Sequence, residues 1–264
     1  MDGVNLSSLA YDITTRDGMD TVPAVVGSNV SASQAHGERW IKKFYAPARK
    51  QLIMWVSSRD KDTGVEGATL DIKRQNLDEN IDYLMLLFGR RTRLLDVRRT
   101  LSNGTIRQAS AEVVAQIDPL MVGLSHAKFS VELNIPSGFW RDVASSTMLT
   151  TAPGSNIVIA AGATAPMVDL EFRITGPATN PRVTDVESGS YFQYNGTVSA
   201  GNTLAVKNST MTITGGTLSN MVHDGETNWV TLYPSINGTK LNFTASGTTG
   251  ATELEVVGKK AYLR

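Results

Sequence analysis

The sequence predicts a mainly β protein, in which a β-rich α+β region with one amphipathic helix precedes an antiparallel β-sandwich or barrel. Apolar and polar residues alternate over residues 168–174, which places one face of a strand in a core and the other in water. Asn-Gly or Asp-Gly pairs at residues 195–196, 224–225 and 237–238 accept the positive φ angles of tight hairpin turns. The clearest helical period lies in one segment, residues 77–88.

Charge density divides the chain into two halves. Residues 1–141 carry 18 basic and 16 acidic side chains, whereas residues 142–264 carry 7 and 9 and are rich in Thr, Ser, Gly and Asn. The Ser/Thr/Pro/Gly-rich stretch 145–155 reads as a linker or as an opening extended strand. We therefore expect one domain over residues 1–141 and a second over residues 142–264.

The predicted helix has a complete apolar face and signals at both ends. Its apolar residues at helical spacing are Leu77, Ile81, Leu84, Met85 and Phe88. Asn76 followed by Glu79 resembles a capping box, and Gly89 suits a left-handed residue beyond the C-terminus.

Strands are expected around this helix. The unbroken apolar run 52–56 suits a strand buried on both faces. Residues 93–101 and 105–114 are predicted to pair as a hairpin whose turn is Ser-Asn-Gly at residues 102–104. Residues 129–135 alternate like a half-buried strand. The polar segment 16–43 has no lasting period, and suits either the lid of an enzyme or an extended arm that orders on a neighbouring subunit.

Bulk composition excludes several classes of function. Lys+Arg and Asp+Glu both number 25, so the balanced chain lacks the field that draws proteins to nucleic acid or anionic membranes. The absence of cysteine excludes disulfides, thiol catalysis and thiolate metal sites, and is compatible with folding in a reducing cytoplasm. The N-terminus does not resemble a signal peptide, and the apolar windows are too short to cross a bilayer.

The sequence shows no recognisable catalytic apparatus. The three histidines, His36, His126 and His223, are far apart and form no metal-binding motif. Neighbouring carboxylates such as Asp169 and Glu171 are typical of a solvated strand face, and no phosphate-binding glycine loop occurs. We therefore predict no catalytic residue, no cofactor and no metal.

Arginines cluster after the predicted helix, and they are our candidate interface. They are Arg90, Arg91, Arg93, Arg98 and Arg99. Cations beside a helix C-terminus complement its dipole, which is the plainer interpretation. No aromatic residues interleave with them, so nucleic-acid binding is the weaker functional option. We favour a protein–protein contact.

Aromatic residues of the second half allow two interpretations. The residues concerned are Tyr191, Phe192, Tyr194, Trp229 and Tyr233. They suit either a sugar-stacking platform or the core and rim of strands. Because the chain has few rings with which to fill a core, we favour the core.

Several segments together resemble the distal tail protein family of long-tailed phages. In the first half these are the Asp-Gly-Val start at residues 2–4, the single helix, the following hairpin and the strand ending Ile-Pro-Ser-Gly-Phe-Trp at residue 140. In the second half they are residues 172–183, with Gly-Pro and Asn-Pro between strands, and residues 196–204, with a Gly-Asn-Thr-Leu turn. The run 229–237 matches the family only approximately, because Ser235 and Ile236 interrupt its usual turn.

The resemblance implies a fold, a role and partners. The first domain would form a hexameric ring at the end of the tail tube, and the second would be a galectin-like sandwich that projects outward. The ring would join the tail tube protein to the hub, or tail-associated, protein and the receptor-binding parts, with the tape measure protein in its channel. The family is a minor structural component of the virion tail tip, made in the host cytoplasm before assembly. It implies no enzymatic activity, no specific nucleic-acid binding and no membrane insertion.

Two other functions remain open at this point. A carbohydrate-binding or receptor-binding module of a tail tip would use the aromatic residues of the second half. A glycan-processing enzyme would need two carboxylates that converge in a cleft.

Overall fold

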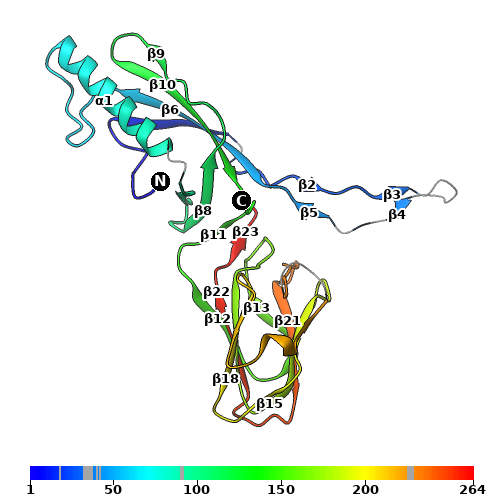
Figure 1. The fold of residues 1–264 in the computed structure, drawn as a ribbon. Coiled ribbons are helices and arrows are strands. Elements are labelled where there is room, and N and C mark those ends of the chain that lie inside the picture. The colour runs from blue at the N-terminus through cyan, green and yellow to red at the C-terminus, as the bar shows by residue number, and fades with distance from the viewer. Residues whose placement is uncertain (18, 32–37, 40, 42, 90–91, 225–228) are drawn as a thin grey trace. The chain divides into compact units, whose positions relative to one another are not determined.

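The computed structural model describes residues 1–264 except 18, 32–37, 40, 42, 90–91 and 225–228. The chain forms two compact units: Met1–Trp140 together with Leu263–Arg264, and Arg141–Tyr262 (Figure 1). Strands dominate both units and the described residues hold a single α-helix, which confirms the predicted mainly β class. The last two residues return to the first unit, a detail that charge density along the chain does not reveal.

The first unit is built on an antiparallel sheet in which four strands follow the order β1-β6-β10-β8. Two further strands extend it, since β7 pairs with β8 and β9 pairs with β10. The strands are β1 (Tyr11–Asp17), β6 (Ala48–Ser57), β7 (Leu95–Thr100), β8 (Ile106–Val113), β9 (Leu120–Val122) and β10 (His126–Ile135). β7 and β8 form the predicted hairpin, and Gly104 in its turn has a φ of +81°.

Strand β6 is buried on one face only, so the prediction of burial on both faces is wrong. Leu52, Met54 and Val56 are buried, whereas Ile53 and Trp55 between them remain partly exposed. The opposite face of β6 carries polar side chains as well. On it, the Gln51 amide donates a hydrogen bond to the Ser130 hydroxyl of β10 at 3.1 Å. An apolar run alone does not separate a doubly buried strand from one whose second face is half covered.

Helix α1 (Leu70–Phe88) packs its buried side chains against β6 and β10. It begins seven residues before the predicted start, because the Thr69 side chain caps it by accepting a hydrogen bond from the Ile72 amide at 3.3 Å. Asn76 lies inside the helix and donates to the Ser58 carbonyl instead of capping. Gly89 has a right-handed φ of −75°, so the predicted left-handed cap is also wrong.

A hairpin arm leaves the first unit between β1 and β6. We call residues 22–46 the arm; its strands are β2 (Val25–Val26), β3 (Val30–Ser31), β4 (Glu38–Arg39) and β5 (Phe44–Tyr45). β2 pairs with β5, and β3 pairs with β4. Figure 1 shows these strands extending away from the sheet of the first unit. The sequence allowed two interpretations of the segment 16–43, either an enzyme lid or an extended arm. Part of that segment lies outside the described residues.

The second unit contains two antiparallel sheets, consistent with the predicted β-sandwich. One sheet has the order β12-β22-β14-β18-β19, and the other has the order β13-β21-β15-β16-β20 with β17 beside β15. Their bounds are β12 (Ser146–Thr151), β13 (Gly154–Ala160), β14 (Leu170–Thr175), β15 (Ala178–Asp185), β16 (Tyr191–Tyr194), β17 (Thr197–Val198), β18 (Thr203–Lys207), β19 (Thr212–Thr214), β20 (Met221–His223), β21 (Thr239–Ser246) and β22 (Glu253–Gly258).

The remaining elements of the chain are short. They are β11 (Trp140–Asp142), β23 (Ala261–Tyr262) and a 3₁₀ turn, η1 (Leu218–Asn220). The Ser/Thr-rich stretch after residue 145 begins with strand β12. Of the two interpretations that the sequence allowed, linker or strand, the strand is therefore correct. Alternation in β14 is as predicted, since Leu170, Phe172 and Ile174 are buried.

The predicted turn pairs behave differently from one another. Gly238 has the expected positive φ, at +89°. At Asn195-Gly196 the prediction is wrong, since neither residue has a positive φ. A side chain on Gly196 would instead meet the Tyr194 ring, with its Cβ 2.8 Å from a ring carbon, so close packing explains this glycine. Gly225 lies outside the described residues.

Two buried polar side chains fix the segment 229–233 in the sandwich. The Asn208 amide donates to the carbonyls of Val168 and Val230 at 2.7 and 2.6 Å, and its oxygen accepts from the Val230 amide at 3.0 Å. The Asp185 carboxylate accepts from the amides of Ser188 and Tyr233 at 2.8 and 3.1 Å. Both side chains are fully buried, so these hydrogen bonds replace the water that burial removes.

Candidate assembly interface

The arginines predicted as an interface do not form one patch. Arg90 and Arg91 lie outside the described residues. Arg93 forms an ion pair with Asp2 at 2.8 Å, and Arg98 forms one with Asp96, two positions away on β7, at 3.0 Å. Arg99 is the most buried of the three and faces residues near the base of the arm. Their partners within the chain are therefore separate carboxylates, and their role in a contact with another protein stays a prediction.

Arg99 anchors the chain just before the arm. One guanidinium nitrogen donates to the Met19 carbonyl at 2.6 Å, and the other pairs with the Asp20 carboxylate at 3.0 Å. The guanidinium also lies over the Trp140 ring, with its carbon 5.2 Å from the ring centroid. The guanidinium group of arginine is planar and rigid, so it can donate to a carbonyl and a carboxylate at once while it stacks on a ring face.

A second buried cation supports the same region. Lys50 of β6 is 2% exposed, and its ammonium donates to the Thr21 carbonyl at 2.9 Å. Burial lowers the pKa of Lys50 from its ordinary value, and the positive charge of Arg99 lowers it further. Two basic side chains from two strands thus hold the carbonyls of Met19 and Thr21, which directs the chain into the arm.

The far side of the arm base is fixed by packing. The Tyr45 ring meets the Phe139 ring edge-on, with centroids 5.4 Å apart. The Ala46 amide donates to the Ala24 carbonyl at 2.7 Å, which closes the two arm strands at their base. Gly138 allows a close approach here, because a Cβ on it would lie 2.9 Å from the Ala46 carbonyl oxygen.

Beyond this fixed base the arm exposes apolar side chains. Val25 and Val26 on β2 are 58% and 47% exposed, and Phe44 on β5 is 59% exposed. Isolated two-stranded hairpins are marginally stable in water, since they have no core against which to pack. An exposed apolar hairpin on a fixed base is typical of a surface that another chain covers.

Exposed large apolar side chains are concentrated in the first unit. Besides those of the arm, they lie on α1, for example Leu86 at 69%, and around β9, for example Leu120 at 62%. Those of the second unit are Val158, Val186, Leu218, Val222 and Ile236. The first unit is therefore the better candidate for extensive contacts with other protein chains.

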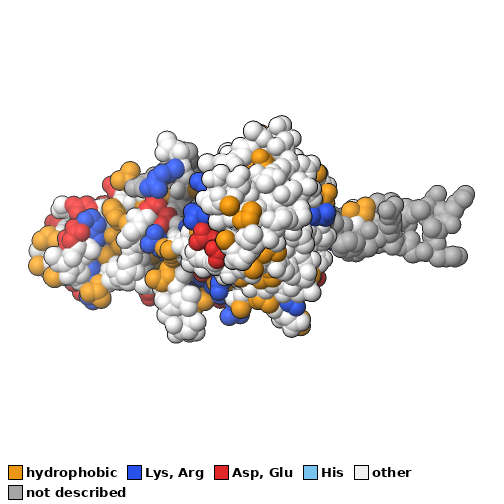
Figure 2. Space-filling view, turned by 90° about the horizontal axis from the view of Figure 1, so that it is seen from below, with side chains coloured by type: hydrophobic (Ala, Val, Ile, Leu, Met, Phe, Trp, Pro, Cys, Tyr) orange, Lys and Arg blue, Asp and Glu red, His pale blue; other side chains and the backbone are white. Residues whose placement is uncertain are grey.

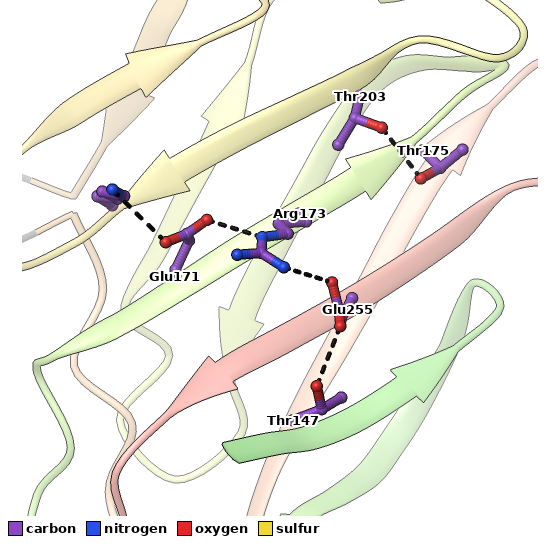
Figure 3. A network of polar contacts seen from close by, with 7 residues as sticks. Thr147, Glu171, Arg173, Thr175, Thr203 and Glu255 are labelled. Carbon is purple, nitrogen blue, oxygen red and sulfur yellow. Dashed lines mark hydrogen bonds and ion pairs between the residues drawn. The ribbon is translucent and has the colours of Figure 1, made fainter. Parts of the chain in front are cut away.

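The sheet that contains β14 carries an internally paired polar network on its outer face. Arg173 pairs with Glu171 at 2.7 Å and with Glu255 at 3.1 Å, and Glu255 accepts a hydrogen bond from Thr147. Figure 3 shows these side chains in line across three neighbouring strands. Such pairs satisfy one another, so this face offers no unpaired charge at its centre, and its members solvate the sheet. Figure 2 is seen from below relative to Figure 1, so the lower end of the second unit faces the viewer. The surface at that end is mostly uncharged.

Most of the aromatic residues considered as a sugar platform belong to the core, as favoured from the sequence. Phe192 and Trp229 are 0% and 2% exposed, and Tyr194 is 8% exposed. Phe192 meets Phe172 of the opposite sheet edge-on at 5.2 Å. Tyr191 is partly exposed, but the Arg182 guanidinium covers its ring at 3.6 Å. The rings of Phe192, Tyr194 and Trp229 are therefore not available as a stacking platform for a pyranose, whereas Tyr233 is partly exposed like Tyr191.

The described histidines do not share a unit. His36 lies outside the described residues, whereas His126 and His223 belong to different units. Within the described part of the chain, no three His, Cys, Asp or Glu side chains group in a way that could hold a metal ion. No helix among the described residues is long and apolar enough to span a membrane.

Comparison with known proteins gives no match by sequence and a clear match by structure. No protein-family model matches the chain, and no curated protein matches it. Among solved structures, the SPP1 Dit (gp 19.1) protein matches with a TM-score of 0.63 at 14% identity, over 99% of this chain and 97% of that one. That protein is described as a paradigm of the hub adsorption apparatus in Gram-positive-infecting phages.

The chain has the fold of a phage distal tail protein. The likeness extends over both units, so the resemblance stated from the sequence is confirmed at the level of the fold. A chain of the phage P2 baseplate in its activated conformation also matches, over 96% of this chain and 92% of that one, with 7% identity and a TM-score of 0.40.

Proposed function

We propose that this protein is a structural component of the tail tip of a long-tailed phage, and that it acts there as a distal tail protein without enzymatic activity. The observation that carries the proposal is the likeness to the SPP1 Dit protein, which includes both units and nearly the whole of each chain. A fold match that is complete in this way involves the arm-bearing unit and the sandwich together, rather than a common sandwich alone.

In this proposal the first unit closes into a hexameric ring. Ring closure by rotation requires head-to-tail contacts, so each subunit must offer two different surfaces. The arm supplies one of them, because it is fixed at its base by Arg99 and Lys50 and apolar beyond it. The apolar surfaces on α1 and around β9 are available as the other.

The second unit is then a galectin-like sandwich that projects from the ring. Its outer polar network is internally paired and most of its aromatic rings are buried, which suits a spacer or a docking platform better than a sugar site. The carbohydrate-binding alternative finds no support in the described aromatic residues. A glycan-processing activity likewise finds no support in Glu171 and Glu255 of the second unit, because both pair with Arg173 on the outer face of their sheet.

The ring would join the tail tube protein to the hub and the receptor-binding parts, and would leave a channel for the tape measure protein and then for DNA. A chain with 25 basic and 25 acidic side chains would not grip DNA strongly as it passes. The site of action would be the virion, after synthesis in the host cytoplasm.

The proposal is tested by the oligomeric state of an arm variant. We expect a purified protein carrying Val25→Asp and Phe44→Asp to lose the ring while both units stay folded, because charges would occupy a surface meant for a neighbour. Ile236→Asp is the matched control, since Ile236 is fully exposed in the second unit. Light scattering after size exclusion gives the mass, and circular dichroism checks the fold. Rings that survive the arm variant would contradict the role of the arm.

A further inference from the structure

A cavity of about 930 Å³ opens in the first unit, and none of its lining residues belongs to helix α1. It is bounded by the N-terminal residues, β1, β7 and the turn that follows β7. Apolar side chains contribute to its lining, among them Leu6, Leu52 and Val97, all of them buried. The cavity thus combines an apolar floor with a wall that carries charge.

The charged part of the lining is mainly basic. It comprises Arg16, Arg98, Arg99 and Arg264, with Asp2 and Asp20 as the acidic members. Arg98 and Arg99 have acidic partners in Asp96 and Asp20. The side chains of Arg16 and Arg264 have no acidic partner within 4.0 Å in the part of the chain that the structure describes. The cavity therefore presents an excess of positive charge.

Helix α1 carries the complementary pattern on its outer face. Asp78, Asp82 and Leu86 follow one another at intervals of four residues, so they form one stripe, and all three are exposed. The rise of a helix places successive members about 6 Å apart. Neither aspartate pairs with a cation among the described residues, whereas Lys73 on the same helix pairs with Glu66 at 2.5 Å.

We propose that this cavity receives the Asp78–Asp82–Leu86 stripe of helix α1 from a second copy of the chain. The aspartates would meet the basic wall, and Leu86, which is 69% exposed, would reach the apolar floor. One helical turn with its side chains occupies about 500 Å³, given a diameter of about 11 Å and a pitch of 5.4 Å. Two whole turns would occupy about 1,000 Å³, slightly more than the cavity of about 930 Å³, so the cavity admits the outward-facing side of the two turns rather than the turns as a whole.

The contact is of the kind that builds a ring. No residue of α1 lines the cavity, so donor and acceptor are two separate surfaces of one unit and the contact is heterologous. Opposite charges would set the register and orientation of neighbouring subunits more than the total affinity, which the apolar arm would supply. This inference rests on the proposed ring and names a contact within it.

A charge exchange tests the contact. The helix variant carries Asp78→Lys and Asp82→Lys, and the cavity variant carries Arg16→Glu and Arg98→Glu. All four side chains are exposed at the surface, so the fold should persist, and circular dichroism and thermal unfolding check this. The control, Glu187→Lys with Glu253→Lys, reverses two exposed carboxylates of the second unit.

We expect each variant alone to need at least a tenfold higher concentration than wild type for half-assembly. An equimolar mixture of the two variants should regain the ring. When they alternate, which an even-numbered ring allows, the lysine-bearing helix meets the glutamate-bearing cavity, and the unchanged helix meets the unchanged cavity. Variants that assemble like wild type, or a mixture of folded variants that fails to recover, would overturn this contact and leave the ring standing. A wild-type protein that never assembles would instead contradict the ring, and the contact with it.

Discussion

Arg99 lies over the ring of Trp140 while it binds the Met19 carbonyl and the Asp20 carboxylate, so a single side chain connects β7, the end of the first unit and the chain that leads into the arm. Arg99 stood among the candidate interface residues because of its neighbours in sequence. Its observed contacts make it a positioning residue for the arm, which would affect assembly without touching a neighbour.

We expect Arg99→Ala to lower the free energy of unfolding of the first unit by about 2 kcal/mol, from the loss of charged hydrogen bonds and the ring contact. Amide exchange of residues 19–21 should accelerate with it, measured by mass spectrometry. Arg98→Ala is the control, because Arg98 is 54% exposed and pairs only along its own strand, and it should leave both quantities almost unchanged. Equal protection of residues 19–21 in the two variants would contradict the anchoring role.

Asn208 should be one of the most sensitive polar positions of the sandwich. Asn208→Ala removes the side-chain amide. The carbonyls of Val168 and Val230 then lose their side-chain donor, and the Val230 amide loses its side-chain acceptor. We expect a loss of about 2–4 kcal/mol in urea unfolding. Asn202→Ala, at an exposed turn, should change stability by less than about 0.5 kcal/mol. Similar losses in the two variants would show that the buried hydrogen bonds do not stabilise the segment 229–233.

We expect the buried Asp185 carboxyl to make the free energy of unfolding depend on pH. Burial raises the pKa of its carboxyl above the ordinary value of 3.8, although hydrogen bonds from Ser188 and Tyr233 oppose the rise. Between 3.8 and the higher pKa of the folded state, the folded protein binds more protons at this site than the unfolded chain. The stability that Asp185 contributes therefore falls as the pH rises through this window, and is constant above and below it.

The test compares wild type with Asp185→Asn, which does not titrate. The unfolding free energy of wild type minus that of the variant should decrease as the pH is raised through the window, and urea unfolding at a series of pH values measures it. Titrations of other groups cancel in this difference. A difference that is flat or that increases with pH would contradict the assigned effect of burial.

Gly176 occupies a site that admits no side chain. A Cβ there would lie 2.3 Å from the Val198 carbonyl oxygen and 2.4 Å from that of Ser199, and both contacts are with backbone. We expect Gly176→Ala to lower the melting temperature markedly, by about 5–10 °C if the cost is about 2 kcal/mol. Gly250→Ala should have little effect, because nothing lies within 4 Å of the added carbon. Equal melting temperatures for the two variants would be incompatible with the packing around Gly176.

Local patterns predicted the strands and hairpins well, because alternation and turn residues act within a few positions. β14, β10 and the β7–β8 hairpin are examples. The start of α1 differs from the prediction because its first turn, from Leu70 to Arg74, is mostly exposed and shows no apolar period. The Thr69 cap and the acidic Asp71 are its local signals. The observed burial of β6 depends on what covers Ile53 and Trp55, which is a property of tertiary structure.

The candidate interface was less accessible from sequence. Proximity in the chain grouped Arg93, Arg98 and Arg99, but their partners Asp2, Asp96 and Asp20 come from different parts of the first unit. The apolar arm residues look ordinary in sequence, since valine and phenylalanine occur equally in cores. Only the structure shows that Val25 and Phe44 are exposed.

We propose that this chain closes into a ring, and imaging of the purified protein would show the ring itself. We would record negative-stain electron micrographs of the purified protein together with its mass by light scattering. We expect six-fold rings with a central hole and a mass near six times 28.5 kDa. Particles that remain monomeric at 28.5 kDa across the accessible concentrations, without rings on the grid, would contradict it.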